Sequence, residues 1–141
     1  MNRTLAVVFS LGLSTGILAD AVAAGPGQDA VIADYAEKAK LADPAFTGFD
    51  AAAGKAFFFA KHVGGGADTP SCTSCHTEDI TKPGQTRAGK TIDPMAVSVT
   101  VDRLTDLAKV EKWIRRNCNS VLGRDCTPKE AGDVLFWLAS Q

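Results

Sequence analysis

The sequence of 141 residues has little net charge, no long apolar run and few histidines and methionines. Its formal net charge of -1 lacks the basic excess of nucleic-acid-binding domains, so we expect no nucleic-acid partner. The most apolar stretch, residues 5–18, is shorter than the roughly 20 residues of a membrane span, so we expect no stable membrane insertion. Histidine and methionine occur only as His62, His76, Met1 and Met95. Metal binding through histidine or methionine must therefore rely on these four residues.

The beginning of the chain has the composition of a secretory signal peptide. A basic start at Arg3 precedes the apolar stretch, and small residues follow through "ADAVAAGPGQ". We predict a cleaved signal peptide over residues 1–23 and a single domain over residues 24–141, because the remainder suffices for one core and contains no internal repeat. We therefore expect a periplasmic protein, in a compartment where cysteines can pair stably.

Three residues in "SCTSCHTED" form a C-x-x-C-H motif, the attachment pattern of c-type haem. Thiols at Cys72 and Cys75 can form thioether bonds with the two vinyl groups of one porphyrin, and His76 then lies beneath the iron. A zinc site would need two further ligands nearby, and a thioredoxin-like redox pair would need a βαβ context. The motif therefore predicts one covalently bound haem c with His76 as an axial ligand.

The rest of the chain has the pattern of helices joined by loops, which predicts an all-α fold. Apolar spacing predicts helices over residues 29–42, 50–63 and 101–117. The stretch "TPKE" predicts a capping box at the start of a last helix, with Thr127 as N-cap. The segment from residue 76 to about 100 has no sustained period, and we expect a loop there.

These features resemble the class I cytochrome c fold. In that family the first and last helices cross closely, which Gly54 would permit and which Phe58 and Trp137 would fill. More narrowly, the stretch from "SCTSCH" through "GQTRAGK" and "VEKWIRRNCNSVLGRDCTP" resembles the sphaeroides haem protein group of high-spin c-type cytochromes. The resemblance implies a monohaem cytochrome that accepts electrons from a dihaem or other c-type cytochrome. It also implies binding of O2, NO or CO at the ferrous haem.

The residue that completes the iron coordination is the main open question. Class I cytochromes usually place a methionine sulfur opposite the histidine, and the only candidate in the mature chain is Met95. By analogy with that class, however, we expect the Pro94 carbonyl to accept a hydrogen bond from His76 Nδ1 and Met95 to pack beside the haem on the same side. The alternative is a plain electron carrier with Met95 as sixth ligand.

One polar residue falls on an apolar helical stripe. Leu107, Val110, Trp113, Ile114 and Asn117 share a face at 100° per residue. Trp113 is assigned to the core, where its indole N–H could reach a haem propionate. The pattern alone favours Asn117 as a C-terminal helix cap. The resemblance implies instead that Asn117 is the sixth ligand, because that group has an asparagine at the matching position. An amide should hold ferric iron better than ferrous iron, so reduction would open the site to diatomic gases.

The remaining candidate residues are predicted to have structural roles. Cys118 and Cys126 are predicted to form a disulfide, because the haem uses the other two cysteines, and the resemblance agrees. We also consider that this bridge limits the movement of Asn117. His62 is predicted to cap a helix end rather than bind iron. No distal His, Asp or Glu is evident for proton delivery, so we expect no enzyme activity. A haem reductase of oxygen or nitrogen oxides remains an alternative.

Overall fold

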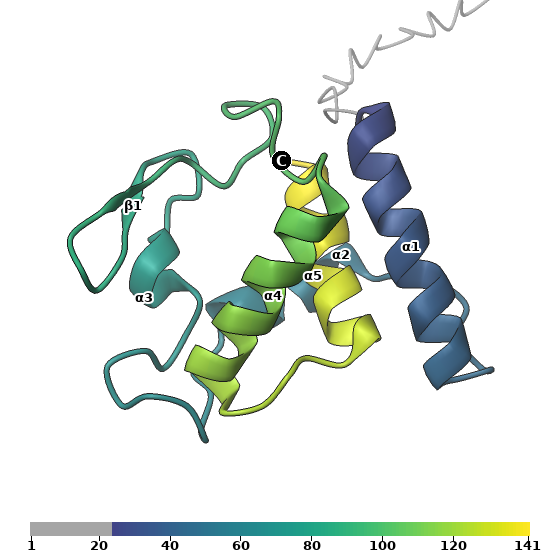
Figure 1. Ribbon diagram of the computed structural model, residues 1–141, viewed down its shortest axis with the longest axis horizontal. Coiled ribbons are helices and arrows are strands. Elements are labelled where there is room, and N and C mark those ends of the chain that lie inside the picture. The colour runs from purple at the N-terminus through teal and green to yellow at the C-terminus, as the bar shows by residue number, and fades with distance from the viewer. Residues whose placement is uncertain (1–23) are drawn as a thin grey trace, which may run out of the picture.

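A computed structural model describes residues 24–141, and the predicted signal peptide lies outside the described residues. The described part is almost entirely helical (Figure 1), which agrees with the predicted all-α class. Figure 1 places α1 on one side, α2, α4 and α5 in the middle, and α3 with a short hairpin on the other side. The helices are α1 (Pro26–Ala42), α2 (Ala51–Phe59), α3 (Thr73–His76), α4 (Leu107–Leu122) and α5 (Pro128–Ala139).

The segment predicted as loop contains one small exception to the all-α fold. Strands β1 (Gly84–Gln85) and β2 (Thr91–Ile92) pair antiparallel, with Gly84 opposite Ile92. β1 packs against α3 so closely that a Cβ on Gly84 would lie 2.1 Å from the Cys75 carbonyl oxygen. The hairpin therefore braces the short helix of the C-x-x-C-H motif.

The crossing of α2 and α5 forms the centre of the fold, as the resemblance implied. A Cβ on Gly54 would lie 2.0 Å from the Asp133 carbonyl oxygen, so only glycine allows this approach of the two backbones. Next to the crossing, the rings of Phe58 and Trp137 pack with centroids 5.2 Å apart, and both side chains are buried. The Asp133 carboxylate also accepts a hydrogen bond of 2.9 Å from the backbone N–H of Asp50, just before α2.

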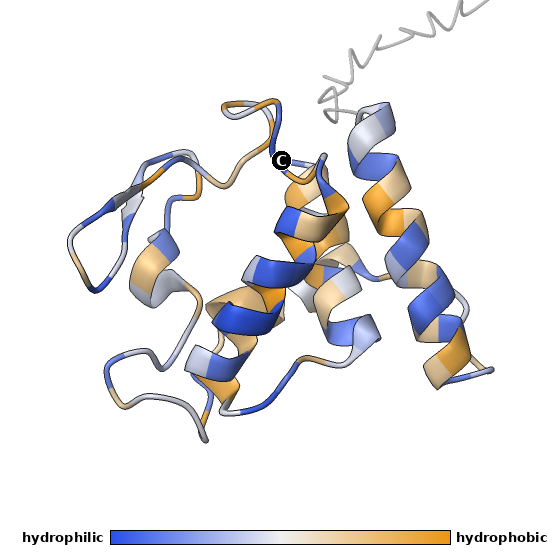
Figure 2. Ribbon diagram, viewed as in Figure 1, coloured by the Kyte–Doolittle hydropathy of each residue, from blue (hydrophilic) through white to orange (hydrophobic). Residues whose placement is uncertain are grey.

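Helix α1 covers the other side of α5. Val31 and Tyr35 are buried there in a cluster with Val110, Ala131 and Leu135. On this face Val31 is fully buried, whereas its neighbour Ile32 is only partly buried. Figure 2 shows the result: apolar residues gather on α5 and behind α4, while polar residues cover the outward face of α4. None of the described helices is long and apolar enough to cross a membrane.

Helix α4 differs from its predicted range of 101–117 at both ends. It begins after Asp106, whose side chain accepts a hydrogen bond of 3.0 Å from the Lys109 N–H. It ends at Gly123, which has the left-handed φ of 69° typical of a helix C-cap. Asn117 therefore lies inside the helix, and the interpretation of Asn117 as its C-terminal cap is wrong.

Helix α2 is shorter than its predicted range, and the loop after it packs against the end of α4. The Gly66 N–H and the Thr69 hydroxyl both donate to the Ser120 carbonyl, at 2.8 and 2.9 Å. These bonds satisfy a carbonyl near the helix end that has no intrahelical partner. The chain that leads into the C-x-x-C-H motif is thereby attached to α4.

Candidate functional site

A partly open cavity lies among α2, α3, α4 and α5, and its lining is mainly apolar. Cys72, His76 and Met95 contribute to one part of its lining, and Ile114 and Asn117 of α4 contribute to another. Most of the remaining lining is apolar and comes from α2, α4, α5 and the connection between α4 and α5: Phe57, Phe58, Cys118, Val121, Leu122, Cys126, Ala131, Val134 and Leu138. The cavity thus brings together most of the predicted site residues.

The C-x-x-C-H motif forms the single turn α3. The N–H groups of Cys75 and His76 both donate to the Cys72 carbonyl, at 3.3 and 3.1 Å. Neither Cys72 nor Cys75 takes part in a disulfide, and both are half-buried. Burial raises the pKa of the Cys72 thiol to about 11, so this thiol is protonated at neutral pH. The turn therefore holds two free thiols and an imidazole close together, as covalent attachment of haem c requires.

The His76 ring is buried and neutral. Burial, helped by the charge of Arg103, lowers its pKa to about 4. Its Nδ1 atom has no hydrogen-bond partner within residues 24–141. The predicted bond from this atom to Pro94 is therefore absent, because the Pro94 carbonyl accepts a hydrogen bond of 2.9 Å from Arg103 Nε instead. Arg103 also donates to the neighbouring Asp93 carbonyl, so its guanidinium holds this segment in place.

Met95 lies in the cavity wall close to the histidine segment. The N–H groups of Met95 and Ala96 donate to the Ile80 carbonyl, at 2.9 and 3.0 Å. Its side chain is partly buried against the core cluster that contains Phe58 and Trp137. The backbone at Met95 is thereby attached to the chain that directly follows His76.

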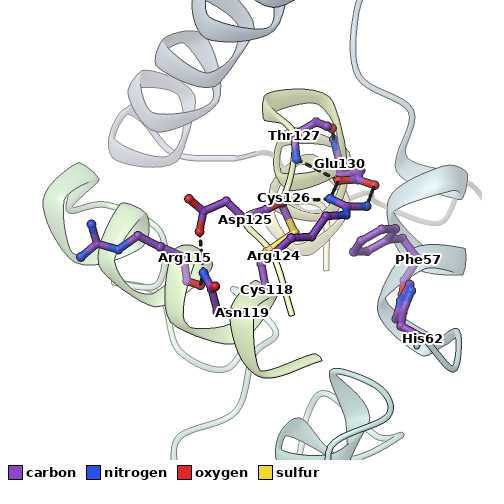
Figure 3. The surroundings of a disulfide bond; sticks show 10 residues. All are labelled: Phe57, His62, Arg115, Cys118, Asn119, Arg124, Asp125, Cys126, Thr127 and Glu130. Carbon is purple, nitrogen blue, oxygen red and sulfur yellow. Dashed lines mark hydrogen bonds and ion pairs between the residues drawn. A yellow bond between two sulfur atoms is a disulfide. The ribbon is translucent and has the colours of Figure 1, made fainter. Parts of the chain in front are cut away.

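Asn117 extends from α4 to the cavity, and its side chain makes no hydrogen bond to any described residue. Asn119, two positions later, is fully engaged in contrast. The Asn119 amide donates to the Arg115 carbonyl and to the Asp125 carboxylate (Figure 3). A half-buried amide without a partner is unfavourable by up to about 1–3 kcal/mol. Of these two asparagines, only Asn117 is available to a group inside the cavity.

The structure places Trp113 outside the core and outside the cavity wall. Its side chain is 45% exposed, and its ring lies beside Lys112 and Arg116, at 5.7 and 5.4 Å from its centroid. The prediction that Trp113 belongs to the core is wrong, whereas its approach to a haem propionate stays a prediction. The buried stripe of α4 continues through Val110, Cys118 and Val121, which leaves Trp113 at its exposed edge.

The two cysteines outside the motif form the disulfide that their number favoured. Cys118 of α4 is bonded to Cys126, just before α5, with their Cα atoms 5.5 Å apart (Figure 3). The bridge closes the segment between the two helices and forms part of the cavity wall. It adjoins Asn117 in the sequence.

Glu130 also lines the cavity, although its sequence pattern indicated only a capping box. The cap is present, and the carboxylate additionally binds both terminal nitrogens of Arg124, at 2.8 and 2.7 Å. The hydrogen bonds from Arg124 lower the pKa of Glu130 to about 2, so it stays ionised. Its position could have been found from the four-residue spacing with Val134 and Leu138 on the buried face of α5.

His62 lies outside the cavity wall, as its predicted role as a cap requires. Its Nε2 atom is 2.9 Å from the carbonyl oxygen of Phe57, in the last turn of α2. The His62 ring also packs on the Phe57 ring, with centroids 4.6 Å apart. The side chain is thus engaged at the helix end.

Two solved structures share this fold. The first is that of oxidised SHP, an oxygen-binding cytochrome c, with a TM-score of 0.74 and 53% identity over 81% of this chain and 96% of that one. The second is oxidised cytochrome c'' from Methylophilus methylotrophus, with a TM-score of 0.68 and 32% identity over 79% of this chain and 92% of that one. Together with the cavity and its motif, they establish a class: the chain is a c-type cytochrome with one covalently bound haem c.

Comparisons of sequence narrow this class. Residues 44–138 match the family described as domain of unknown function DUF1924. The cytochrome c-type protein SHP of Cereibacter sphaeroides is 61% identical over 92 residues, which is 65% of this chain and 71% of that protein. Cytochrome c'' of Methylophilus methylotrophus is 31% identical over 140 residues, which is 99% of this chain and 94% of that protein. The chain therefore belongs to the DUF1924 family of c-type cytochromes.

Proposed function

We propose that this cytochrome accepts electrons in the periplasm and binds a diatomic gas at its reduced haem, with Asn117 as a displaceable ligand. Cys72 and Cys75 would hold the haem through thioether bonds, and His76 and Asn117 would be the two residues that bind its iron. When bound, the haem supplies an iron that exchanges one electron and, in its ferrous state, takes up O2, NO or CO. The observation that supports the proposal is that His76 and Asn117, from different helices, line one cavity together with Cys72 of the attachment motif.

The environment of Asn117 supports its role as a ligand that can leave. No described residue holds its amide by a hydrogen bond, so no such bond has to break when the amide rotates. An amide is a weak neutral donor that suits ferric better than ferrous iron. Once released, its N–H can donate a hydrogen bond to the incoming ligand. The related SHP is described as oxygen-binding, and the solution structure of cytochrome c'' concerns haem-ligand detachment.

Electron transfer and ligand binding account for the site better than turnover does. Glu130 is the only carboxylate that lines the described cavity, and its ion pair with Arg124 keeps its pKa near 2. It is therefore a poor proton donor at neutral pH, whereas reduction of oxygen or nitrogen oxides consumes protons. The family resemblance suggests a dihaem cytochrome c as the electron donor. The disulfide is consistent with an oxidising compartment.

The test is a set of ferric and ferrous absorption spectra of the holoprotein, with and without CO. Asn117→Ala should alter the ferric spectrum, whereas the matched variant Asn119→Ala should leave it unchanged. Met95→Leu should keep the native ferric spectrum and the native uptake of CO. A low-spin spectrum with a sulfur-to-iron band that disappears in Met95→Leu would contradict the proposal and establish a plain His/Met electron carrier.

A further inference from the structure

A second cavity lies beside the first, between α1, α4 and the start of α5. It leaves about 160 Å³ open to the centres of water-sized molecules, more than ten times the roughly 10–15 Å³ that one water needs. Its outer residues include Tyr35 of α1, Glu111 and Arg115 of α4, and Asp125 in the loop after it. This space is therefore large enough to hold a diatomic molecule.

The two cavities share part of their lining. Ile114, Cys126 and Ala131 line both of them, so a single layer of side chains separates the second cavity from the haem cavity. Cys126 is held by its disulfide, and Ala131 has no side-chain torsion to change. Ile114 is the only one of the three that can open the layer by rotating about its side-chain bonds.

Ile114 also lies close to the ligand site. It precedes Asn117 by three positions on α4, so the two side chains are neighbours along one face of the helix. A molecule that passed Ile114 would reach the haem cavity beside Asn117. The displacement of Asn117 and the arrival of a ligand would then occur at the same place.

The polar groups around the second cavity favour passage of a small neutral molecule. Glu111 is paired with Lys38, and Asp125 accepts a hydrogen bond from Asn119 (Figure 3). These pairs keep charged side chains at the rim, whereas the shared layer is apolar. Ions would lose their hydration at this layer, and a diatomic gas would not.

We propose that the cavity between α1 and α4 is the access route by which diatomic ligands reach the distal side of the haem, with Ile114 as its gate. The proposal rests on the proposed gas binding. It predicts that the gate affects the rates of association and dissociation together, because a gate changes the barrier between two states and leaves their free-energy difference unchanged.

The first test measures CO association and dissociation on the reduced holoprotein by flash photolysis and ligand exchange. Ile114→Ala should raise both rates about tenfold, a change of about 1.4 kcal/mol in barrier height. Val110→Ala, a similar truncation one turn earlier that lines neither cavity, should leave both rates unchanged. If the native protein takes up no CO, the proposed function fails; if it does and Ile114→Ala has native rates, only the route fails.

The second test blocks the proposed route at a position that does not line the haem cavity. Arg115 lines the second cavity but not the haem cavity, so Arg115→Trp should fill the route and lower both CO rates about tenfold. Arg116→Trp, the same change at a position that lines neither cavity, is the control. Native rates in Arg115→Trp would overturn the route. Xenon-pressurised crystals give an independent readout: xenon should bind beside Ile114 in the native protein and be absent there in Arg115→Trp.

Discussion

The histidine side and the asparagine side of the cavity are built in different ways. The histidine side is made by residues close in sequence: a single turn from Thr73 to His76, the hairpin that follows, and a segment that returns to Met95. The asparagine side combines α4 with a disulfide to the start of α5 and a loop from before the motif. The histidine side is built from residues close in sequence and carries the attachment motif. The asparagine side depends on contacts between distant residues and shapes the rest of the cavity.

The two sides also differ in how tightly their functional groups are held. His76 lies in a turn whose backbone Gly84 of the hairpin approaches closely, although its Nδ1 atom has no hydrogen-bond partner among the described residues. Asn117 is half-buried, and no described residue bonds its amide. The proposed function needs His76 to stay at the iron while Asn117 leaves, and the braced turn that carries His76 suits the first of these roles.

The largest effect is expected from substitutions on the histidine side alone. Replacing Cys72 and Cys75 together by serine should abolish covalent haem attachment, because serine cannot form thioethers. Haem staining after denaturing electrophoresis, with mass spectrometry of the chain, measures this. The double variant of Cys118 and Cys126 to serine is the control and should keep its haem. Covalent haem in the first variant would refute the assigned attachment site.

A substitution at the crossing of α2 and α5 should damage both sides at once. Alanine normally stabilises a helix interior relative to glycine, by about 0.5–1 kcal/mol. Gly54→Ala should instead lower the free energy of unfolding by about 1–3 kcal/mol, because its Cβ would overlap the Asp133 carbonyl oxygen. Urea unfolding measures the change, with Ala56→Val at an exposed position of α2 as the control for a small helical substitution. A more stable Gly54→Ala variant would contradict the close crossing.

Removing the disulfide should weaken the asparagine side alone. Replacing Cys118 and Cys126 by serine should lower the free energy of unfolding by about 2.5 kcal/mol, because the unfolded chain regains the freedom of a short closed loop. Urea unfolding of the holoprotein measures this loss. The rate of CO association in the same variant tests whether the bridge limits the movement of Asn117. An unchanged rate would restrict the bridge to a structural role.

The smallest expected effect lies in the ion pair of Glu130 and Arg124. The folded-state pKa of Glu130 is lowered to about 2, so its stabilisation is present above the unfolded pKa of about 4.5 and is lost as the pH falls towards 2. Because the pair is partly exposed, we expect a loss of about 0.2–1 kcal/mol. Glu130→Gln can keep the capping box and should lack this part of the pH dependence. Urea unfolding at pH 7 and pH 3 compares the two proteins, and identical pH dependence would contradict the assignment.

The sequence predicted some features well because they depend on neighbouring residues. The capping box of Thr127 and Glu130, the helix after it and the single turn of the haem motif are all local. The limits of α4 were wrong at both ends, because Asp106 and Gly123 were not recognised as caps. The predicted hydrogen bond from His76 to the Pro94 carbonyl is absent, because the chain folds back and Arg103 donates to that carbonyl instead. The assignment of Trp113 to the core was wrong, because helical spacing does not identify where a buried stripe ends.

By itself, the sequence determined how this protein holds its cofactor. Two thiols and an imidazole at fixed spacing define that chemistry wherever the turn lies, because covalent attachment depends on short-range geometry. Only the tertiary structure decided that Asn117 shares a cavity with His76 and that one layer of side chains separates this cavity from a second one. These relations depend on how α2, α4 and α5 pack, and packing joins residues that the sequence keeps far apart.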